Sequence, residues 1–158
     1  MLERRIGFVV AGDSVTIVDT TVPEDDDKPI VIEADDTWKL PNGDRAKAYD
    51  VMYRRCANYI KENKIKRAII KASAVTMGST KLSHLKSCEL RGVIIAASAS
   101  VAEVTLIAKS VISRTYGERK VDEYLQDDSF WAGMTEGGSL RKTSREAAMV
   151  VIAARNER

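Results

Sequence analysis

Glu89 is an acidic residue in a segment whose other residues on the same helical face are apolar or small. Within 81–100 this face recurs at steps of three and four residues and comprises Leu82, Leu85, Glu89, Gly92, Val93 and Ala96. Such spacing predicts a helix that directs this face into the protein. An ionised carboxylate buried without a partner costs several kcal/mol, so we expect a cation, hydrogen-bond donors or a metal ion beside Glu89.

The second half of the chain carries cationic residues in or beside its expected loops. They are Arg114, Arg119, Lys120, Arg141, Lys142 and Arg145. Cations of this kind contact phosphates in nucleic-acid-binding proteins, and Trp131 and Tyr116 are candidates for stacking on exposed bases. Solvated surface charge is the alternative for the cations, as it is for the cluster 61–67. Core packing is the alternative for Trp131.

Other chemistries have less support. His84 is the only histidine, and neither a zinc-binding spacing nor a Walker-type glycine loop occurs. Cys56 and Cys88 fall on apolar helix faces, which predicts reduced thiols rather than a disulfide. The net charge of +2 is too small to indicate wholesale attraction to polyanions. The first apolar run is too short for a signal peptide or a membrane span, so we expect a cytoplasmic protein with no membrane partner.

Hydrophobic periodicity and turn residues predict the elements that must position these side chains. Strands are expected at 6–10, 15–18, 30–40, 68–70 and 104–107, the first two joined as a hairpin. Helices are expected at 46–60, 81–100, 109–114, 118–126 and 143–155, the last apolar nearly all round and therefore buried. The length predicts a single domain, 1–158. This order predicts an α/β fold with a mixed five-stranded sheet, antiparallel over its first three strands and then parallel, with helices on both faces.

That order, with an acid in the middle of the second long helix, resembles the RNase H-like fold. More narrowly it resembles the RuvC Holliday-junction resolvase group and a related bacterial family of small uncharacterised proteins. The segment Glu-Leu-Arg-Gly-Val-Ile-Ile-Ala-Ala at 89–97 is similar to the corresponding helix of that group. More weakly, 6–9 is similar to its opening strand, 69–72 to its fourth strand and 145–148 to the start of its closing helix.

In active members of that group, the resemblance implies, acids at these four places hold two divalent metal ions that activate water and stabilise the leaving oxygen. The matching positions here are Val9, Ala72, Glu89 and Glu146. Two of the four anionic ligands are therefore missing, which implies a degraded metal site with no cofactor. Lys71, beside Ala72, is a candidate to replace the missing cation and pair with Glu89.

Three functions are compatible with the sequence, which leaves open whether the protein is an enzyme. The first is a catalytically inactive nucleic-acid-binding or assembly module. The second is a Mg- or Mn-dependent nuclease that uses Glu89, Glu146 and a hairpin acid, Asp13 or Asp19. The third is a protein-interaction module, such as a homodimer, without nucleic acid.

Each acid also has a structural alternative. An Asx turn accounts for Asp13, and a solvent-facing strand end accounts for Asp19. The pattern from Thr143 to Glu146 matches a capping box, in which Glu146 satisfies a free backbone amide at the start of the closing helix.

Overall fold

The protein is described here from a computed structural model of its 158 residues. The structure describes residues 2–74, 78, 81–116, 119–138 and 140–157, without the side chains of Thr115 and Tyr116. The stacking role predicted for Tyr116 therefore lies outside the described residues.

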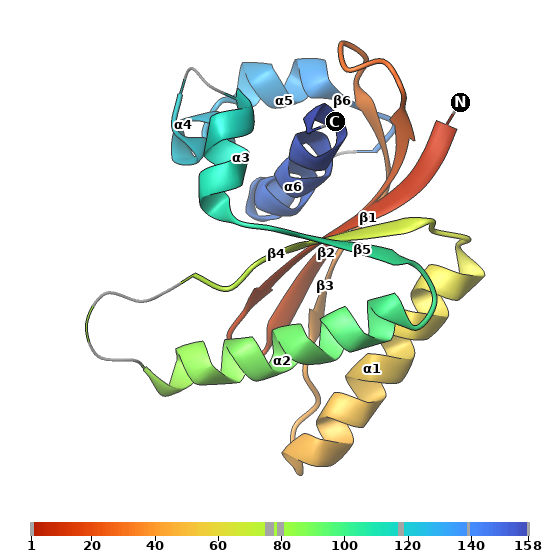
Figure 1. The fold of residues 1–158 in the computed structure, drawn as a ribbon, viewed down its shortest axis with the longest axis vertical. Helices are drawn as coiled ribbons and strands as arrows, with labels where there is room; N and C mark the ends of the chain where they lie inside the picture. Colours follow the sequence, from red (N-terminus) through yellow and green to blue (C-terminus); the bar gives the residue numbers. More distant parts are fainter. Residues whose placement is uncertain (1, 75–77, 79–80, 117–118, 139, 158) are drawn as a thin grey trace.

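The described strands form one mixed sheet in the order β5-β4-β1-β2-β3-β6 (Figure 1). Their bounds are β1 Leu2–Ala11, β2 Ser14–Pro23, β3 Ile30–Lys39, β4 Arg67–Lys71, β5 Glu103–Ile107 and β6 Thr135–Glu136. The first three strands pair antiparallel, β4 and β5 continue parallel to β1, and β6 is parallel to β3. This confirms the predicted α/β fold class, with one strand more than expected. The sixth strand was missed because two residues are too short to show a periodic pattern.

Helices cover both faces of the sheet (Figure 1). On one face α1 (Arg45–Glu62) packs beside α2 (Leu82–Ala99). On the other face lies α6 (Arg145–Asn156), preceded by a 3₁₀ turn at Lys142–Ser144. Around α6 lie α3 (Lys109–Tyr116), α4 (Val121–Leu125) and α5 (Asp128–Met134). In the described part of the chain, each helix is too short or too polar to cross a bilayer.

The pleat of β1 separates two hydrophobic cores. Ile6, Phe8 and Val10 pack towards α1 and α2, whereas Val9 packs in the core around α6. Gly7 faces α6 at very close range, because a Cβ atom on it would lie 2.0 Å from the carbonyl oxygen of Ala147. Only a residue without a side chain allows this approach, so β1 and α6 meet almost backbone to backbone.

The predicted orientation of α2 is wrong. Leu82 and Leu85 are 65% and 50% exposed, and Glu89, on the same face, is exposed as well. The buried residues of this helix are instead Ser87, Leu90, Arg91, Ile94, Ala97 and Ser98. Small and apolar side chains occur nearly all round α2, so periodicity alone fits two faces. The face with Leu90, Ile94 and Ala97 fills the core, and the face that carries the Glu89 carboxylate is exposed.

Candidate functional site

The carboxyl ends of β1 and β4, on the face covered by α6, form the place where the resemblance puts a metal site. Val9 lies near the end of β1 and contacts the α6 core, and Lys71 ends β4. The first turn of α6 brings Glu146 to the same place, where its Oε1 forms an ion pair with Lys71 Nζ. Both side chains are about three-quarters buried, at 24% and 28% exposure. The carboxylate of Glu146 is thus neutralised by a lysine of the sheet.

This donor set does not fit a two-metal centre. Two divalent ions carry four positive charges and need several hard oxygen ligands, whereas Val9 and Ala72 offer no carboxylate and Glu146 already holds an ammonium group. Within the described residues no three His, Cys, Asp or Glu side chains gather in a way that could hold a metal ion.

Glu89 lies on the opposite side of the sheet from Glu146, because α2 and α6 pack on opposite faces (Figure 1). It is exposed and accepts a hydrogen bond from the Tyr49 hydroxyl at 3.2 Å. The expected pair of Lys71 with Glu89 is therefore wrong: Lys71 binds Glu146 instead.

Asp13 belongs to the same network as Glu89. Arg45 donates to the Tyr49 hydroxyl at 2.5 Å and lies 3.3 Å from Asp13 Oδ1. The hydrogen bond with Tyr49 is the main reason that the pKa of Arg45 is raised. The structure thus brings Asp13 and Glu89 together through a tyrosine and an arginine, and it brings neither of them to Glu146.

Asp19 is buried, at 1% exposure, so its expected solvent-facing position is wrong. Arg4 Nε donates to its Oδ1 at 3.0 Å, and the Tyr59 hydroxyl donates to its Oδ2 at 2.8 Å. Burial, and then the neighbouring carboxylate of Asp19, raises the pKa of the Tyr59 hydroxyl. Asp19 therefore ties β1, β2 and α1 together.

The predicted capping box at the start of α6 does not form. The N-cap is Ser144, whose side chain makes no capping hydrogen bond and instead donates to Asp35 Oδ1. The 3₁₀ turn that precedes α6 places Ser144 against β3, while Glu146 turns to Lys71.

Arg91 is a site residue that the sequence interpretation missed. It is 8% exposed on the inner face of α2, and its guanidinium donates to the Val10 carbonyl at 3.0 Å and to Ser73 Oγ at 2.6 Å. It fastens the end of β1 to the segment that follows β4. The signal was its position next to Leu90 on the inward face, which the wrong orientation of α2 concealed.

Three of the predicted phosphate-binding cations form close ion pairs within the protein. Arg119 binds Asp127 at 2.9 Å and its guanidinium lies over the Tyr124 ring. Arg145 is buried and binds Asp128 at 2.7 Å.

Arg141 is the third, and it binds Asp35 through both its guanidinium and its backbone amide. Burial alone raises the pKa of Asp35, but the hydrogen bonds from Arg141 and Ser144 outweigh it and leave this pKa below its ordinary value.

The other three cations are exposed and held loosely. Arg114 lies 3.8 Å from Glu157, and Lys142 lies 3.9 Å from Asp128. Lys120 forms no ion pair with any described side chain. The positive charges of these three side chains are therefore available to contact a phosphate.

Trp131 occupies the core position that was the alternative to base stacking. Its side chain is 3% exposed, and its Nε1 donates to the Tyr124 carbonyl at 2.9 Å. It packs edge-on against Phe130. The indole ring is thus part of the layer that covers α6.

No protein-family model matches the chain, and no curated protein matches it in sequence. Its fold, however, is similar to that of solved resolvases. The structure of RuvC from Thermus thermophilus shares 8% identity with it, over 97% of this chain and 93% of that one, with a TM-score of 0.74. RuvC from the same organism in complex with a Holliday junction substrate gives 8% identity, 98% and 93% coverage and a TM-score of 0.70.

The yeast mitochondrial Holliday junction resolvase Ydc2 is similar over 98% of this chain and 79% of its own, at 9% identity and a TM-score of 0.65. At such low identity the likeness establishes the fold alone. The chain has an RNase H-like fold of the RuvC type, as its sequence predicts.

Proposed function

We propose that this RuvC-like domain is a nucleic-acid-binding or assembly module that does not cut phosphodiester bonds by a two-metal mechanism. The observation that carries the proposal is the ion pair between Lys71 and Glu146 at the carboxyl ends of β1 and β4. A lysine that neutralises the Glu146 carboxylate at this place removes negative charge that would attract divalent ions. Nucleic acid as the ligand is supported by the similar fold of RuvC, which has been solved with a Holliday junction substrate.

The cations best suited to phosphate contacts are the loosely held ones, Arg114, Lys120 and Lys142. Arg119, Arg141 and Arg145 already neutralise carboxylates of the domain, so a phosphate would have to displace those partners. Binding through exposed cations releases counterions from the nucleic acid, and its affinity therefore falls with salt.

The test compares binding of four-way junction, duplex and single-stranded DNA by the wild type and the triple variant Arg114→Ala, Lys120→Ala and Lys142→Ala. We expect weaker binding and a salt dependence whose slope falls by about three, one for each lost phosphate contact. The control removes an equal charge elsewhere, with Lys39→Ala, Lys47→Ala and Arg54→Ala. Equal affinity and slope in both triple variants would contradict the proposal.

The lack of cleavage is tested with the same DNA substrates and with RNA, in magnesium and in manganese. We expect no product from the wild type. Cleavage that Glu146→Gln abolishes would instead establish the nuclease alternative with Glu146 as a ligand. Glu89→Gln tests whether the acid on the far face of the sheet takes part.

A homodimer is the second candidate, favoured by the outward face of α2. Leu82, Leu85, Gly92 and Ala96 are exposed on this face, which also carries the Glu89 carboxylate held by Tyr49. A second copy of the chain could bury this face, since Gly92 and Ala96 permit close helix contact. Sedimentation should then give a dimer that Leu85→Glu converts to a monomer; a wild-type monomer at high concentration contradicts this candidate.

A further inference from the structure

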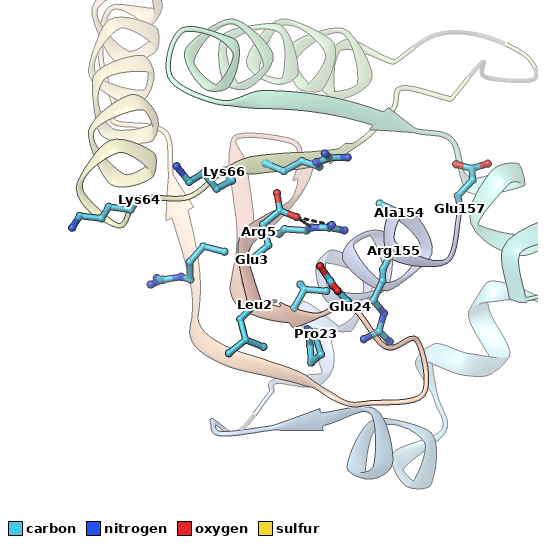
Figure 2. Close-up of a pocket in the computed structure, with 13 residues that line it drawn as sticks. Leu2, Glu3, Arg5, Pro23, Glu24, Lys64, Lys66, Ala154, Arg155 and Glu157 are labelled. Carbon is cyan, nitrogen blue, oxygen red and sulfur yellow. Dashed lines mark hydrogen bonds and ion pairs between the residues drawn. The ribbon is translucent and has the colours of Figure 1, made fainter.

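We infer that a cavity at the amino ends of β1 and β4 binds a nucleoside phosphate, either free or as the terminal nucleotide of a strand. The cavity has a volume of about 920 Å³ and is lined by the start of β1, the end of β2, the α1–β4 connection and the end of α6 (Figure 2). It lies beside Arg67, the first residue of β4, whereas Lys71 and its ion pair lie at the last residue of that strand. The inference goes beyond the proposed function and does not depend on it.

The positive charge available in this cavity comes from two lysines, because Arg4, Arg5, Arg67 and Arg155 are paired with Asp19, Glu3, Glu103 and Asp26. Its described lining contains six cationic and three acidic side chains. Two of the acids form ion pairs within the protein, since Glu3 binds Arg5 at 2.7 Å and Glu157 lies 3.8 Å from Arg114. Of the cations, Lys64 and Lys66 form no ion pair with any described residue, and both are exposed. Their charge is therefore available to an anionic ligand.

The connection between α1 and β4 holds the two lysines in place. Ile65, between them, is buried and its amide donates to the Ile60 carbonyl at 3.0 Å. The Lys66 amide donates to the Arg4 carbonyl at 3.0 Å, and Lys64 adopts a left-handed backbone with φ of 54°. Because this backbone is fixed by its own hydrogen bonds, little ordering of the main chain is needed when a ligand binds.

The opposite side of the cavity combines apolar surface with the carboxylate of Glu24. Leu2, which is 67% exposed, and Pro23 lie across the cavity from Lys66 (Figure 2). Ala154 at the end of α6 also contributes to the lining. Small-molecule sites commonly have volumes of about 300–1,000 Å³ and combine apolar walls with a few charged groups. A nucleoside phosphate fits this arrangement, with its base packed against the apolar residues and its phosphate bound by the two lysines.

A second cavity of about 620 Å³ adjoins the first. The two share Glu3, Lys64, Lys66 and Arg67, and the second adds Lys61. The two lysines therefore lie between the two cavities, and the second cavity adds the Lys61 ammonium group together with Glu103, whose carboxylate is paired with Arg67. A strand whose terminal nucleotide occupies the larger cavity could continue over this basic surface, which is why the free nucleotide and the strand end are tested separately.

The experiment titrates the full chain with AMP, adenosine and inorganic phosphate, and with a short single strand that does or does not carry a 5′-phosphate, by calorimetry. We expect AMP or the phosphorylated strand to bind, and to bind about tenfold or more tightly than the same compound without its phosphate. Tighter binding of AMP would identify a free nucleotide as the ligand, and tighter binding of the phosphorylated strand would identify a strand end.

The site variant is Lys64→Gly with Lys66→Ala, since glycine suits the left-handed backbone at position 64. It should lose about tenfold or more in affinity while its melting temperature stays within a few degrees of the wild type. Lys39→Ala with Lys47→Ala is the matched control and should bind as the wild type does. The double variant Lys120→Ala with Lys142→Ala, which leaves the Arg114–Glu157 pair at the cavity intact, should also keep this binding, and this separates the inference from the proposed function.

Two results overturn the inference. One is the absence of saturable binding by AMP and by the phosphorylated strand. The other is unchanged affinity in the variant at Lys64 and Lys66.

Discussion

α2 and α6 are both rich in small apolar residues, yet α6 is enclosed by other helices whereas α2 is exposed on its outer side. On the α6 side, Ile112, Tyr124 and Trp131 from α3, α4 and α5 pack in one core with the helix. On the other side, α2 keeps one face on the sheet and leaves Leu82 and Leu85 in water. Apolar composition thus fails to separate a helix enclosed by other elements from one with a bare outer surface. What separates them is the chain that follows β5 and folds back over α6.

Gly7→Val tests the enclosed side and should have the largest effect. The new side chain would meet the carbonyl oxygen of Ala147, which belongs to the helix backbone and has no room to move. We expect the free energy of unfolding to fall by at least about 5 kcal/mol, the lower end of the stability of a whole domain. Urea denaturation followed by circular dichroism measures it.

Gly92→Val, on the bare surface of α2, is the control for Gly7→Val, because a Cβ atom there meets nothing within 4 Å. It should cost less than about 1 kcal/mol. Similar losses in the two variants would mean that α6 does not press on β1 as described.

Trp131→Ala tests whether the cover over α6 is part of the core. Loss of the buried indole and of its hydrogen bond to the Tyr124 carbonyl should lower the free energy of unfolding by about 3–5 kcal/mol. Leu82→Ala, on the outer face of α2, is the comparison and should change stability by less than about 0.5 kcal/mol. Loss of nucleic-acid affinity in Trp131→Ala without loss of stability would restore the stacking role.

Asp35→Asn tests the attachment of the turn before α6 to β3. Because Arg141 is half exposed, we expect a loss of about 1–2 kcal/mol at neutral pH. The pKa of Asp35 is lowered in the folded protein, so its contribution is present above the ordinary value of 3.8 and is lost as the pH falls through the lower, folded value. The difference between wild type and variant should therefore shrink below pH 3.8 in a pH series of melting temperatures.

Asp36→Asn is the matched control for Asp35→Asn. Its carboxylate is exposed and lies 3.9 Å from Arg55, so the change should be less than about 0.5 kcal/mol at any pH. A difference between wild type and Asp35→Asn that stays constant into acid would show that the carboxylate charge is not what holds the turn.

Gly92→Ala should have a smaller effect than Asp35→Asn, and of the opposite sign. Alanine in an exposed helical position stabilises the helix by about 0.5–1 kcal/mol relative to glycine, and nothing lies within 4 Å of the new methyl group. Thermal unfolding should show a slightly higher melting temperature. If the outer face of α2 is a dimer contact, the methyl group should instead weaken self-association in sedimentation.

The sequence predicts most of the fold because strand and helix periods are local properties. The strands at 30–40 and 104–107 are confirmed as β3 and β5, and the buried closing helix is confirmed as α6. The orientation of α2 could not be predicted, because two of its faces are apolar enough to be buried. Only the packing of Leu90 and Ile94 against the sheet decides between them.

The candidate site shows the same limit. Lys71 and Glu146 could be named from the sequence, but they are 75 positions apart in the chain and their pairing depends on how α6 docks on the sheet. The sequence predicts Arg145 as a phosphate contact, yet its side chain is buried, where it binds the Leu125 carbonyl of α4 and the Asp128 carboxylate of α5. Contacts of this range leave no trace in a local pattern.

The close contact of Gly7 with α6 also bears on how the domain is made. β1 is the first described element and α6 the last, and the contact joins Gly7 to Ala147, 140 positions further along the chain. Contacts of such long sequence separation slow folding, because a large loop must close before they are gained. During synthesis the core around α6 cannot form until the last helix leaves the ribosome, whereas β1, β2, β3 and α1 can associate much earlier. The partly synthesised domain would then expose the α6-facing side of its sheet, including Gly7, to chaperones and to other chains.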